Sequence, residues 1–312
     1  MREGGTAGKA LRVIRVGVAG WDYEDWRGAV YPEPAPRGFD ALAFLAGYFD
    51  AIEVNSTFYR PQTARVARSW ARRVAHLPAF RFTAKAWRRF THERDRAFDA
   101  EEVRLAREAP DALAEEGRLG AVLLQFPWSF KREESSREWL RDVARAFRGL
   151  PLVLEVRHAS WNVPELYRSL SEQGIGFVNV DQPLFHNSLA PSAVATAAVG
   201  YVRIHGRNVH DWFRADAGRD ERYDYLYSAA ELAPWAERAR AVAAVPGVKD
   251  VYVVTNNHFG GQEVANAAML RSMIEGRTVE VPGPLWRRFA PVLDGWAAAS
   301  PGAGGPEPGR PA

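Results

Sequence analysis

The segment from residue 152 to residue 158, Leu-Val-Leu-Glu-Val-Arg-His, alternates its side chains with the two-residue period of a β-strand. One face consists of leucine and valine alone, whereas the other begins at Val153 and becomes ionic only toward its carboxyl end, at Glu155 and Arg157. This pattern favours a parallel barrel strand, with an aliphatic face under a helix and a polar tip that opens onto a site. For this strand alone, a buried Glu–Arg pair that only neutralises itself explains the pattern equally well.

Seven other segments have strand character, and helical patterns separate most of them. The predicted strands cover residues 13–19, 51–55, 80–85, 121–126, 152–157, 175–181, 200–205 and 251–256, and the predicted helices lie near residues 40–49, 63–75, 101–116, 136–147, 163–173, 229–244 and 263–275. Eight strands with intervening helices predict an α/β fold, a TIM-type (β/α)8 barrel. Residues 181–196 contain two prolines and no helical period, so a degenerate sixth helix, reduced to a loop, is expected. A doubly wound open sheet is the alternative, although no Gly-x-Gly-x-x-Gly motif follows the first strand.

The two ends of the chain and one extra helix lie outside this series. Residues 1–12 are predicted to form a flexible arm, and residues 300–312, rich in Gly and Pro, a disordered tail. Residues 13–299 form one predicted domain, because no linker or shift in composition divides them. Within it, residues 284–298 carry apolar side chains at helical spacing and begin with a proline, which suits a first helical turn. This C-terminal helix is expected to pack against its own barrel, and a partner-binding face is the alternative.

Composition excludes several classes of protein. The 312 residues include no cysteine, which excludes disulfides, thiolate metal sites and cysteine nucleophiles. The formal net charge of +3 is too small to indicate an extended nucleic-acid surface. No apolar run approaches the roughly 20 residues of a membrane span, and residues 1–12 lack the apolar core of a signal peptide, so we expect a cytoplasmic protein without a membrane partner.

Polar side chains gather at the carboxyl ends of the other predicted strands as well. The alternation assigns to the inner face of the barrel Glu53 and Asn55, Lys85, Gln125, Asp181, and Arg203 and His205. At the end of the eighth strand, the pattern leaves the face of Asn256 and Asn257 open. Since the carboxyl ends of barrel strands open on one side, these residues are predicted to converge with Glu155 and Arg157 at one mouth. Burying so many charges without a function would cost several kcal/mol for each unpaired ion, which favours a site.

Aromatic residues crowd the loops that follow the strands. Trp21, Tyr59 and Trp161 are expected to wall a pocket over the mouth, where rings could stack on a small ligand. Taken singly, each ring could equally serve only to pack one loop against another.

Three functions fit these residues, and the one we favour is a metal-independent enzyme that needs no cofactor. It would act on a small anionic or phosphorylated substrate held by Arg157, Arg203 and Lys85. Glu53 or Glu155 would serve as general acid or base, with His205 as partner. A strand lysine such as Lys85 could also be desolvated into a Schiff-base nucleophile.

The two other functions remain open. A divalent-metal hydrolase or isomerase would take its ligands from Glu53, Glu155, Asp181 and His205, an oxygen-rich set suited to Mg²⁺ or Mn²⁺. A module that binds a ligand or nucleic acid without catalysis would use the basic, aromatic mouth. A glycosidase with Glu53 and Glu155 as its carboxylate pair is a variant of the enzyme hypothesis.

The motifs at the strand ends also resemble a known family. They are Gly17-Val18-Ala19-Gly20-Trp21, Trp26-Arg27-Gly28, Tyr31-Pro32, Glu53-Val54-Asn55-Ser56-Thr57-Phe58-Tyr59, Lys85-Ala86, Thr91-His92, Leu124-Gln125-Phe126-Pro127, Glu155-Val156-Arg157-His158, Ser160-Trp161, Tyr201-Val202-Arg203-Ile204-His205-Gly206, Asn256-Asn257 and Ala265-Asn266-Ala267. Over residues 13–275 the chain resembles the DUF72 (YecE-like) family. The resemblance implies a TIM-barrel fold and implies no activity. His258 stands where the family pattern more often has a smaller polar residue.

Overall fold

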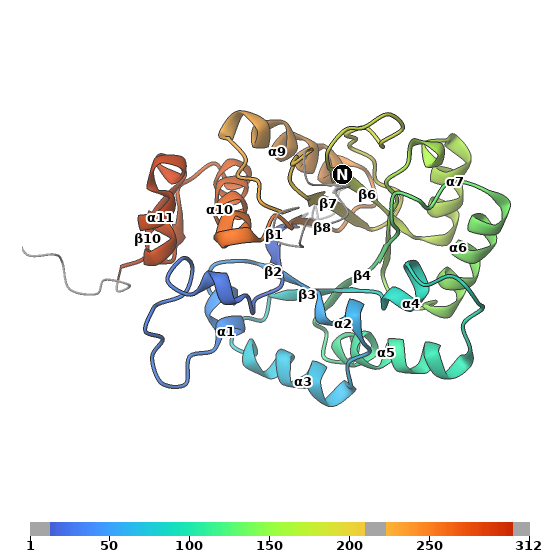
Figure 1. Cartoon of the computed structure of the whole chain (residues 1–312), viewed down its shortest axis with the longest axis horizontal. Helices are drawn as coiled ribbons and strands as arrows, with labels where there is room; N and C mark the ends of the chain where they lie inside the picture. Colours follow the sequence, from blue (N-terminus) through green and yellow to red (C-terminus); the bar gives the residue numbers. More distant parts are fainter. Residues whose placement is uncertain (1–12, 210–222, 302–312) are drawn as a thin grey trace, which may run out of the picture.

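The computed structural model describes residues 13–209 and 223–301, and its centre is a closed barrel of eight parallel strands (Figure 1). The strands follow one another around the barrel in sequence order, and β1 closes against β8. They are β1 (Val13–Ala19), β2 (Ala51–Val54), β3 (Arg81–Lys85), β4 (Leu119–Gln125), β5 (Leu152–Glu155), β6 (Gly176–Asp181), β7 (Val199–Ile204) and β8 (Asp250–Thr255). The predicted TIM-type barrel is therefore confirmed. The predicted arm and most of the predicted tail lie outside the described residues.

Helices surround this barrel, and shorter helical turns lie in the loops that follow the strands (Figure 1). The longer helices are α1 (Ala41–Ala46), α3 (Ala64–Arg73), α5 (Ala100–Glu115), α6 (Glu134–Ala146), α7 (Pro164–Gln173), α9 (Ala229–Ala244) and α10 (Gln262–Glu275). The shorter turns are η1 (Glu24–Trp26), α2 (Ser56–Tyr59), α4 (Arg88–Thr91), η2 (Ala159–Trp161) and η3 (Phe259–Gly261). Residues 182–198, between β6 and β7, contain no helix, so the sixth helix is reduced to a loop as predicted.

Local sequence signals set several of the helix ends. At the start of α5, the Asp99 carboxylate accepts from the Glu102 N–H and the Glu102 carboxylate accepts from the Asp99 N–H, which is a capping box. Helix α7 begins with Pro164 in its first turn and ends at Gly174, whose φ of 66° suits glycine.

The alternation read in residues 152–158 holds in the structure. Leu152, Leu154 and Val156 pack in a buried cluster that also contains residues of α6 and α7. Val153 belongs to a separate cluster inside the barrel. Tyr252 also lies in this inner cluster, and its ring passes so close to Gly120 that a Cβ atom there would lie 2.4 Å from the Tyr252 ring. The barrel interior is thus a packed core below the carboxyl ends of the strands.

The prediction that Asp181 of β6 lies on the inner face of the barrel is wrong. Val180 pairs with Arg203 in the ladder and lies in the inner cluster, so Asp181 points outward. Asn179 also points outward, and its amide group bonds the backbone N–H and C=O of Val194. The physical reason is the missing helix, because a loop that covers a strand brings unpaired backbone groups that need polar partners.

The chain after β8 differs in part from the predicted helix 284–298. Helix α11 (Gly283–Leu293) buries Leu285, Phe289 and Leu293 in the main hydrophobic cluster, so it packs on its own barrel. It stops at Leu293, however, and residues that were predicted to be helical form β10 (Ala297–Ala299), which pairs in parallel with β9 (Val279–Val281). The turn between them contains Gly295 at a φ of 77°, which breaks the helical path.

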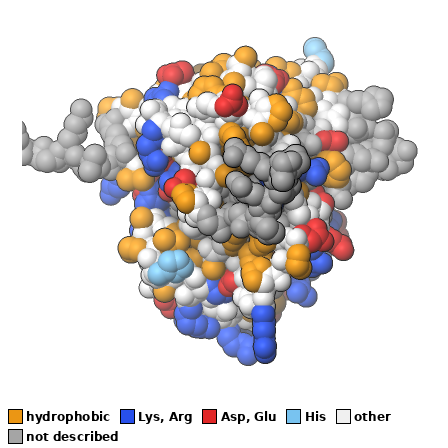
Figure 2. All heavy atoms as spheres, turned by 90° about the vertical axis from the view of Figure 1, so that its left-hand side faces the viewer, with side chains coloured by type: hydrophobic (Ala, Val, Ile, Leu, Met, Phe, Trp, Pro, Cys, Tyr) orange, Lys and Arg blue, Asp and Glu red, His pale blue; other side chains and the backbone are white. Residues whose placement is uncertain are grey.

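The face of the molecule that carries α11 shows acidic, basic and apolar side chains mixed together (Figure 2). No continuous basic track crosses the part of this face that the picture leaves uncovered, which agrees with the small net charge of +3. Within the described residues, no helix has both the length and the apolar character that crossing a bilayer requires.

Candidate active site

A fully buried ionic cluster lies where β2, β5 and β7 end. Arg203 of β7 donates two hydrogen bonds to Glu53 of β2, from Nε to Oε2 at 3.0 Å and from Nη2 to Oε1 at 2.6 Å. Its third nitrogen, Nη1, donates to Oε2 of Glu155 on β5 at 3.0 Å. All three side chains have no exposed surface. One guanidinium therefore bridges two carboxylates inside the barrel, a geometry for which its planar fork is suited.

Arg157 and His205 complete this cluster on the side of Glu155. Arg157 Nε donates to Glu155 Oε1 at 3.0 Å, and His205 Nε2 lies 3.1 Å from the same oxygen. Asn256 accepts from Arg203 through Oδ1, so its Nδ2 group faces His205 Nδ1 at 3.2 Å. A donor facing Nδ1 requires that this nitrogen be unprotonated. The contacts with Glu155 and Asn256 fit a neutral His205 whose proton sits on Nε2 and is donated to Glu155, and Arg157 Nη2 and Arg203 Nη1 lie 3.2 and 3.3 Å from the same Nε2 atom.

Electrostatics agrees with this assignment. Burial lowers the pKa of His205 to about 3, and the nearby Arg157 and Arg203 charges act in the same direction. The pKa of the Glu155 carboxyl lies well below its usual range; burial opposes this shift, and the charges around the carboxyl outweigh it. Burial also raises the pKa of Tyr201, whose hydroxyl donates to Glu53 Oε2 at 2.9 Å. The cluster at neutral pH therefore consists of two carboxylates, two guanidiniums and a neutral imidazole.

Arg203 does not have the predicted role of holding an anionic substrate. Besides the two glutamates, it donates to Gln125 Oε1 at 3.2 Å and to Asn256 Oδ1 at 3.1 Å. Every guanidinium nitrogen already serves a protein acceptor, and no part of the side chain is exposed. Gln125 contacts the cluster through its Oε1 atom, and its side chain is half-buried. Both residues hold the floor of the site in place.

A pocket of about 440 Å³ lies above this floor and opens at the mouth of the barrel. Its polar groups include Lys85 at the end of β3, Asn55 after β2 and Asn256 after β8. Its aromatic walls include Trp21 and Tyr59, as predicted from the sequence, together with Tyr23, Trp70 and Tyr223. Asn256 belongs to both the pocket and the ionic cluster, so the two are in direct contact.

Lys85 is the polar residue of this pocket with the most unusual environment. Its Nζ atom lies 4.4 Å from the centre of the Phe58 ring, and no carboxylate of the described residues forms an ion pair with it. Burial and, to a smaller extent, the charge of Arg203 lower the pKa of Lys85, and the charge of Glu53 opposes them. The net result is a pKa of about 7. His92 packs edge-on against the same Phe58 ring, with the ring centres 4.9 Å apart. Lys85 is thus an amine that can hold or release a proton near neutral pH.

Asn55 adds an unpaired acceptor to the same pocket. Its Nδ2 group donates to the Tyr23 hydroxyl at 3.2 Å, which leaves Oδ1 toward the other side. That oxygen is buried and has no hydrogen-bond partner within residues 13–209 and 223–301. A buried acceptor of this kind is costly unless a ligand or water completes it.

Three of the predicted site residues do not reach the pocket or the cluster. Asp181 pairs instead with Arg207 at 2.9 Å on the outer face of β6. Asn257 bonds the Tyr225 carbonyl and the Asn266 side chain, so it fastens the β8 loop to α10. Trp161 is buried in the outer core, where its indole donates to the Phe130 carbonyl. The structure therefore does not bring these three side chains together with the other predicted site residues.

Several lining residues were not selected from the sequence. Tyr23 follows Trp21 by two positions in the same loop, and the position of His258 directly after the predicted asparagine pair could have drawn attention to it. The two rings stack at 4.7 Å and form one wall. Trp70 comes from the middle of α3, so no strand-end pattern could have indicated it.

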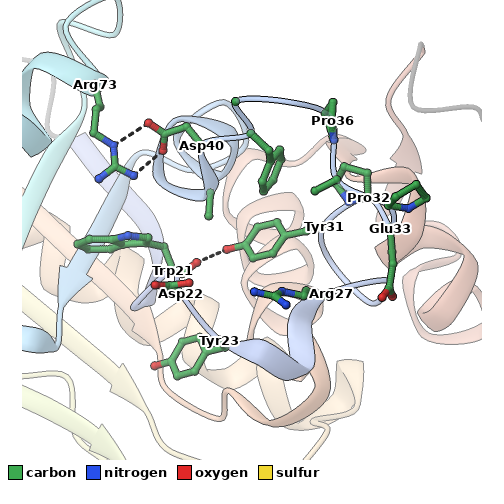
Figure 3. Close-up of a pocket in the computed structure, with 15 residues that line it drawn as sticks. Trp21, Asp22, Tyr23, Arg27, Tyr31, Pro32, Glu33, Pro36, Asp40 and Arg73 are labelled. Atoms are coloured by element: carbon green, nitrogen blue, oxygen red, sulfur yellow. Dashed lines mark hydrogen bonds and ion pairs between the residues drawn. The ribbon is translucent and has the colours of Figure 1, made fainter.

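The loop after β1 also borders a second, larger hollow of about 910 Å³ (Figure 3). Trp21, Asp22 and Tyr23 line both hollows. In the second one, the Tyr31 hydroxyl donates to the Trp21 carbonyl at 2.5 Å, which fixes the shared wall. This shared wall closes the mouth pocket on one side.

The four residues considered as metal ligands do not form one group. Arg203 donates hydrogen bonds to both Glu53 and Glu155, and His205 Nε2 bonds Glu155. Asp181 lies on the other face of β6, where it pairs with Arg207. Within the described residues, no group of three or more His, Asp or Glu side chains has the geometry to hold a metal ion.

Another buried carboxyl, Glu263 on α10, lies close enough to Glu53 and Arg203 to be affected by their charges. It has no exposed surface, and neither of its oxygens has a hydrogen-bond partner in the described parts of the chain. Burial raises the pKa of Glu263 well above its usual range, and the charge of Glu53 adds to this effect. The folded protein therefore keeps a proton on this carboxyl that the unfolded chain releases above its ordinary pKa of 4.5.

This shift makes the stability depend on pH in a defined direction. As the pH rises from 4.5 toward the folded pKa of Glu263, the free energy of unfolding should fall by about 1.4 kcal/mol per pH unit. A Glu263→Gln variant lacks this titration, so its stability relative to the wild type should increase between pH 5 and pH 8. Urea unfolding at both pH values measures this difference. The exposed Glu172→Gln serves as control, and equal differences at the two pH values for Glu263→Gln would contradict the assignment.

Comparisons with known proteins agree on one family. A family model described as "Protein of unknown function DUF72" matches residues 15–288, so it reaches into α11, beyond the stretch whose motifs resemble the family. The UPF0759 protein YunF of Bacillus subtilis (strain 168) is 27% identical over 285 residues, which are 84% of this chain and 95% of YunF. The crystal structure of a DUF72 family protein from Thermotoga maritima MSB8 is 34% identical and superimposes with a TM-score of 0.73 over 84% of this chain and 99% of that one. The crystal structure of a DUF72 family protein from Enterococcus faecalis V583 shares the fold. It is 23% identical and superimposes with a TM-score of 0.71 over 84% of this chain and 96% of that one. The chain belongs to the DUF72 family.

Proposed function

We propose that the protein is an enzyme that binds a small anionic or phosphorylated substrate at the barrel mouth and catalyses general acid/base chemistry there. In this proposal, Lys85 carries the proton that is transferred. The observation that carries the proposal is the environment of Lys85, which packs on Phe58, lines the aromatic pocket and has no carboxylate partner among residues 13–209 and 223–301. A group whose pKa lies near the working pH suits such proton transfer.

The charge balance of the site supports an anionic ligand. The two carboxylates Glu53 and Glu155 are offset by the two guanidiniums Arg157 and Arg203, and His205 is neutral. In the described parts of the chain, a protonated Lys85 forms no ion pair with these carboxylates or with Asp22, the acidic residue that lines the same pocket, and an anion bound beside Lys85 would pair with its charge. Asp22, which also lines the pocket, belongs to the wall shared with the second hollow.

The cluster below Lys85 has a positioning role in this proposal. Glu155 is an ionised carboxylate held by three partners, which makes it a poor proton donor at neutral pH. Together with Glu53 and Arg203 it fixes the charge that acts on Lys85. The acid/base function first assigned to the two glutamates thus passes to the lysine above them. Asn55 and Asn256 would orient hydroxyl or carbonyl groups of the substrate.

The proposal predicts stabilisation by anions that depends on Lys85. Inorganic phosphate, or a small sugar phosphate, should raise the melting temperature, and sulfate, whose charge stays constant over this range, should raise it at pH 6 by more than at pH 8, because the ammonium form is lost as the pH rises through about 7. At one hundred times its dissociation constant, a ligand should add about 2.7 kcal/mol of stability. Differential scanning fluorimetry measures this effect directly.

Two variants make the test specific. Lys85→Met should lose the stabilisation by phosphate and by sulfate, whereas Lys85→Arg, which keeps the positive charge at both pH values, should retain both and lose the dependence on pH that the wild type shows with sulfate. Equal stabilisation of wild type and Lys85→Met would overturn the proposal. Stabilisation by Mg²⁺ or Mn²⁺ instead of phosphate, reversed by a chelator, would favour the metal-dependent alternative.

A further inference from the structure

We infer that the substrate of this pocket carries an aldehyde or ketone group and that the side-chain amine of Lys85 forms a Schiff base with it. This inference rests on the proposed function of the same site and names the chemical class of its substrate. It rests on where Lys85 lies, on what surrounds it and on how it differs from the other lysines of the chain.

The position of Lys85 suits a nucleophile rather than a structural cation. It ends β3 at the barrel mouth, where the Thr57 hydroxyl donates to its backbone carbonyl at 2.8 Å and fixes the strand end. Its Nζ atom lies over the apolar Phe58 ring at 4.4 Å and lines the pocket. Lys85 is half-buried, and a structural lysine taken partly out of water is normally paired with a carboxylate. Glu53 and Glu155 are close enough to act on its charge, yet both are bonded to arginines instead.

The same surroundings supply the neutral amine that attack on a carbonyl requires. The charged groups that act on Lys85 come from three other strands and their ends: Glu53, Glu155, Arg157 and Arg203. Burial and the two guanidiniums outweigh the two carboxylates, so the pKa of Lys85 falls to about 7. An exposed lysine at neutral pH is almost entirely protonated, whereas this one is divided between both forms. Desolvation beside other cations is a known way to activate a lysine for Schiff-base chemistry.

The step balances without any additional reactant. The Nζ lone pair forms a bond to the carbonyl carbon while the carbonyl π electrons move to oxygen, and a proton released from nitrogen passes to that oxygen. The resulting carbinolamine then takes a second proton on its hydroxyl group and loses water as the nitrogen lone pair forms the C=N bond. Overall, the ammonium and the carbonyl compound give a protonated imine and one water. The protonated imine keeps the positive charge, so it can still hold a neighbouring phosphate or carboxylate.

Because the chain contains few lysines, a covalent adduct on Lys85 can be assigned to that residue without ambiguity. The chain contains four lysines, of which Lys131 and Lys249 are exposed and Lys9 lies outside the described residues. The wild-type protein is incubated at pH 7.5 with pyruvate or with dihydroxyacetone phosphate, reduced with sodium borohydride, and analysed by intact and peptide mass spectrometry. A single reduced adduct on Lys85 is expected, formed at least about tenfold faster than on Lys131 or Lys249.

Controls separate this inference from the proposed function. Lys85→Arg should form no adduct while it still gains thermal stability from phosphate. Adduct formation in the wild type should become faster as the pH rises from 6 to 8, opposite to the stabilisation by sulfate. No adduct on Lys85 with either carbonyl compound, or equal adducts on all lysines, would overturn the inference. Stabilisation by phosphate that depends on Lys85 would in that case leave the proposed function standing.

Discussion

An Arg203→Met variant is expected to unfold with a free energy about 3–5 kcal/mol lower than that of the wild type. Methionine fills a similar volume but leaves Glu53 and Glu155 buried without the guanidinium that bridges them. Both carboxylates have no exposed surface, so water cannot replace the lost partner. Urea unfolding, followed by circular dichroism, measures the loss.

A matched control on the surface isolates the effect of burial. Arg104 also bonds two glutamates, Glu101 and Glu108, each at 2.6 Å, but its side chain is 57% exposed. Arg104→Met should therefore change stability by no more than about 1 kcal/mol. If Arg203→Met were as mild as Arg104→Met, the carboxylates of Glu53 and Glu155 would not be ionised in the folded state, and the charge balance proposed for the site would fail.

Acid is expected to destabilise the protein through His205. The unfolded chain takes up a proton on this side chain below its ordinary pKa of 6.5, whereas the folded protein does so only near pH 3. Between these values the unfolded state binds more protons, so the free energy of unfolding falls as the pH decreases, by about 1.4 kcal/mol per pH unit. The contribution is fully present above pH 6.5 and is lost progressively toward pH 3.

A His205→Gln variant separates this effect from the titration of carboxylates. Glutamine can still donate to Glu155 but cannot take up a proton, so its stability should fall less steeply than that of the wild type between pH 6.5 and pH 4. Replacement of the exposed His76 by glutamine should leave the slope of the wild type unchanged. Parallel curves for wild type and His205→Gln would mean that His205 is charged in the folded protein, against the tautomer that Asn256 selects.

The two-residue period of the strands was sufficient to predict the barrel. Each strand buries both faces, so apolar side chains recur along its length, and Glu53, Glu155 and Arg203 each interrupt that pattern near a carboxyl end. Because parallel strands in a barrel end on the same side, position in the sequence was enough to expect these three side chains together. The structure joins them through a single guanidinium.

The same reasoning failed where two faces of a strand were chemically alike or where the cover was unusual. In β6, Asn179 and Asp181 alternate with valines as in the other strands, yet they point outward. The reason lies far along the chain, in a loop that replaces a helix and offers its backbone groups to Asn179. No local period encodes what will cover a strand.

The sequence by itself determined which residues lie at the strand ends, because that depends on local alternation and on the closure of a parallel barrel. Only the tertiary structure decided what each of them does. Arg203 and Lys85 are both basic residues of barrel strands, but Arg203 donates to carboxylates and amides with every nitrogen, whereas Lys85 packs on Phe58 and has no carboxylate partner in the described residues. Hydrogen bonding and burial are set by distances between residues far apart in the chain, and they decide which cation is part of the floor and which can react.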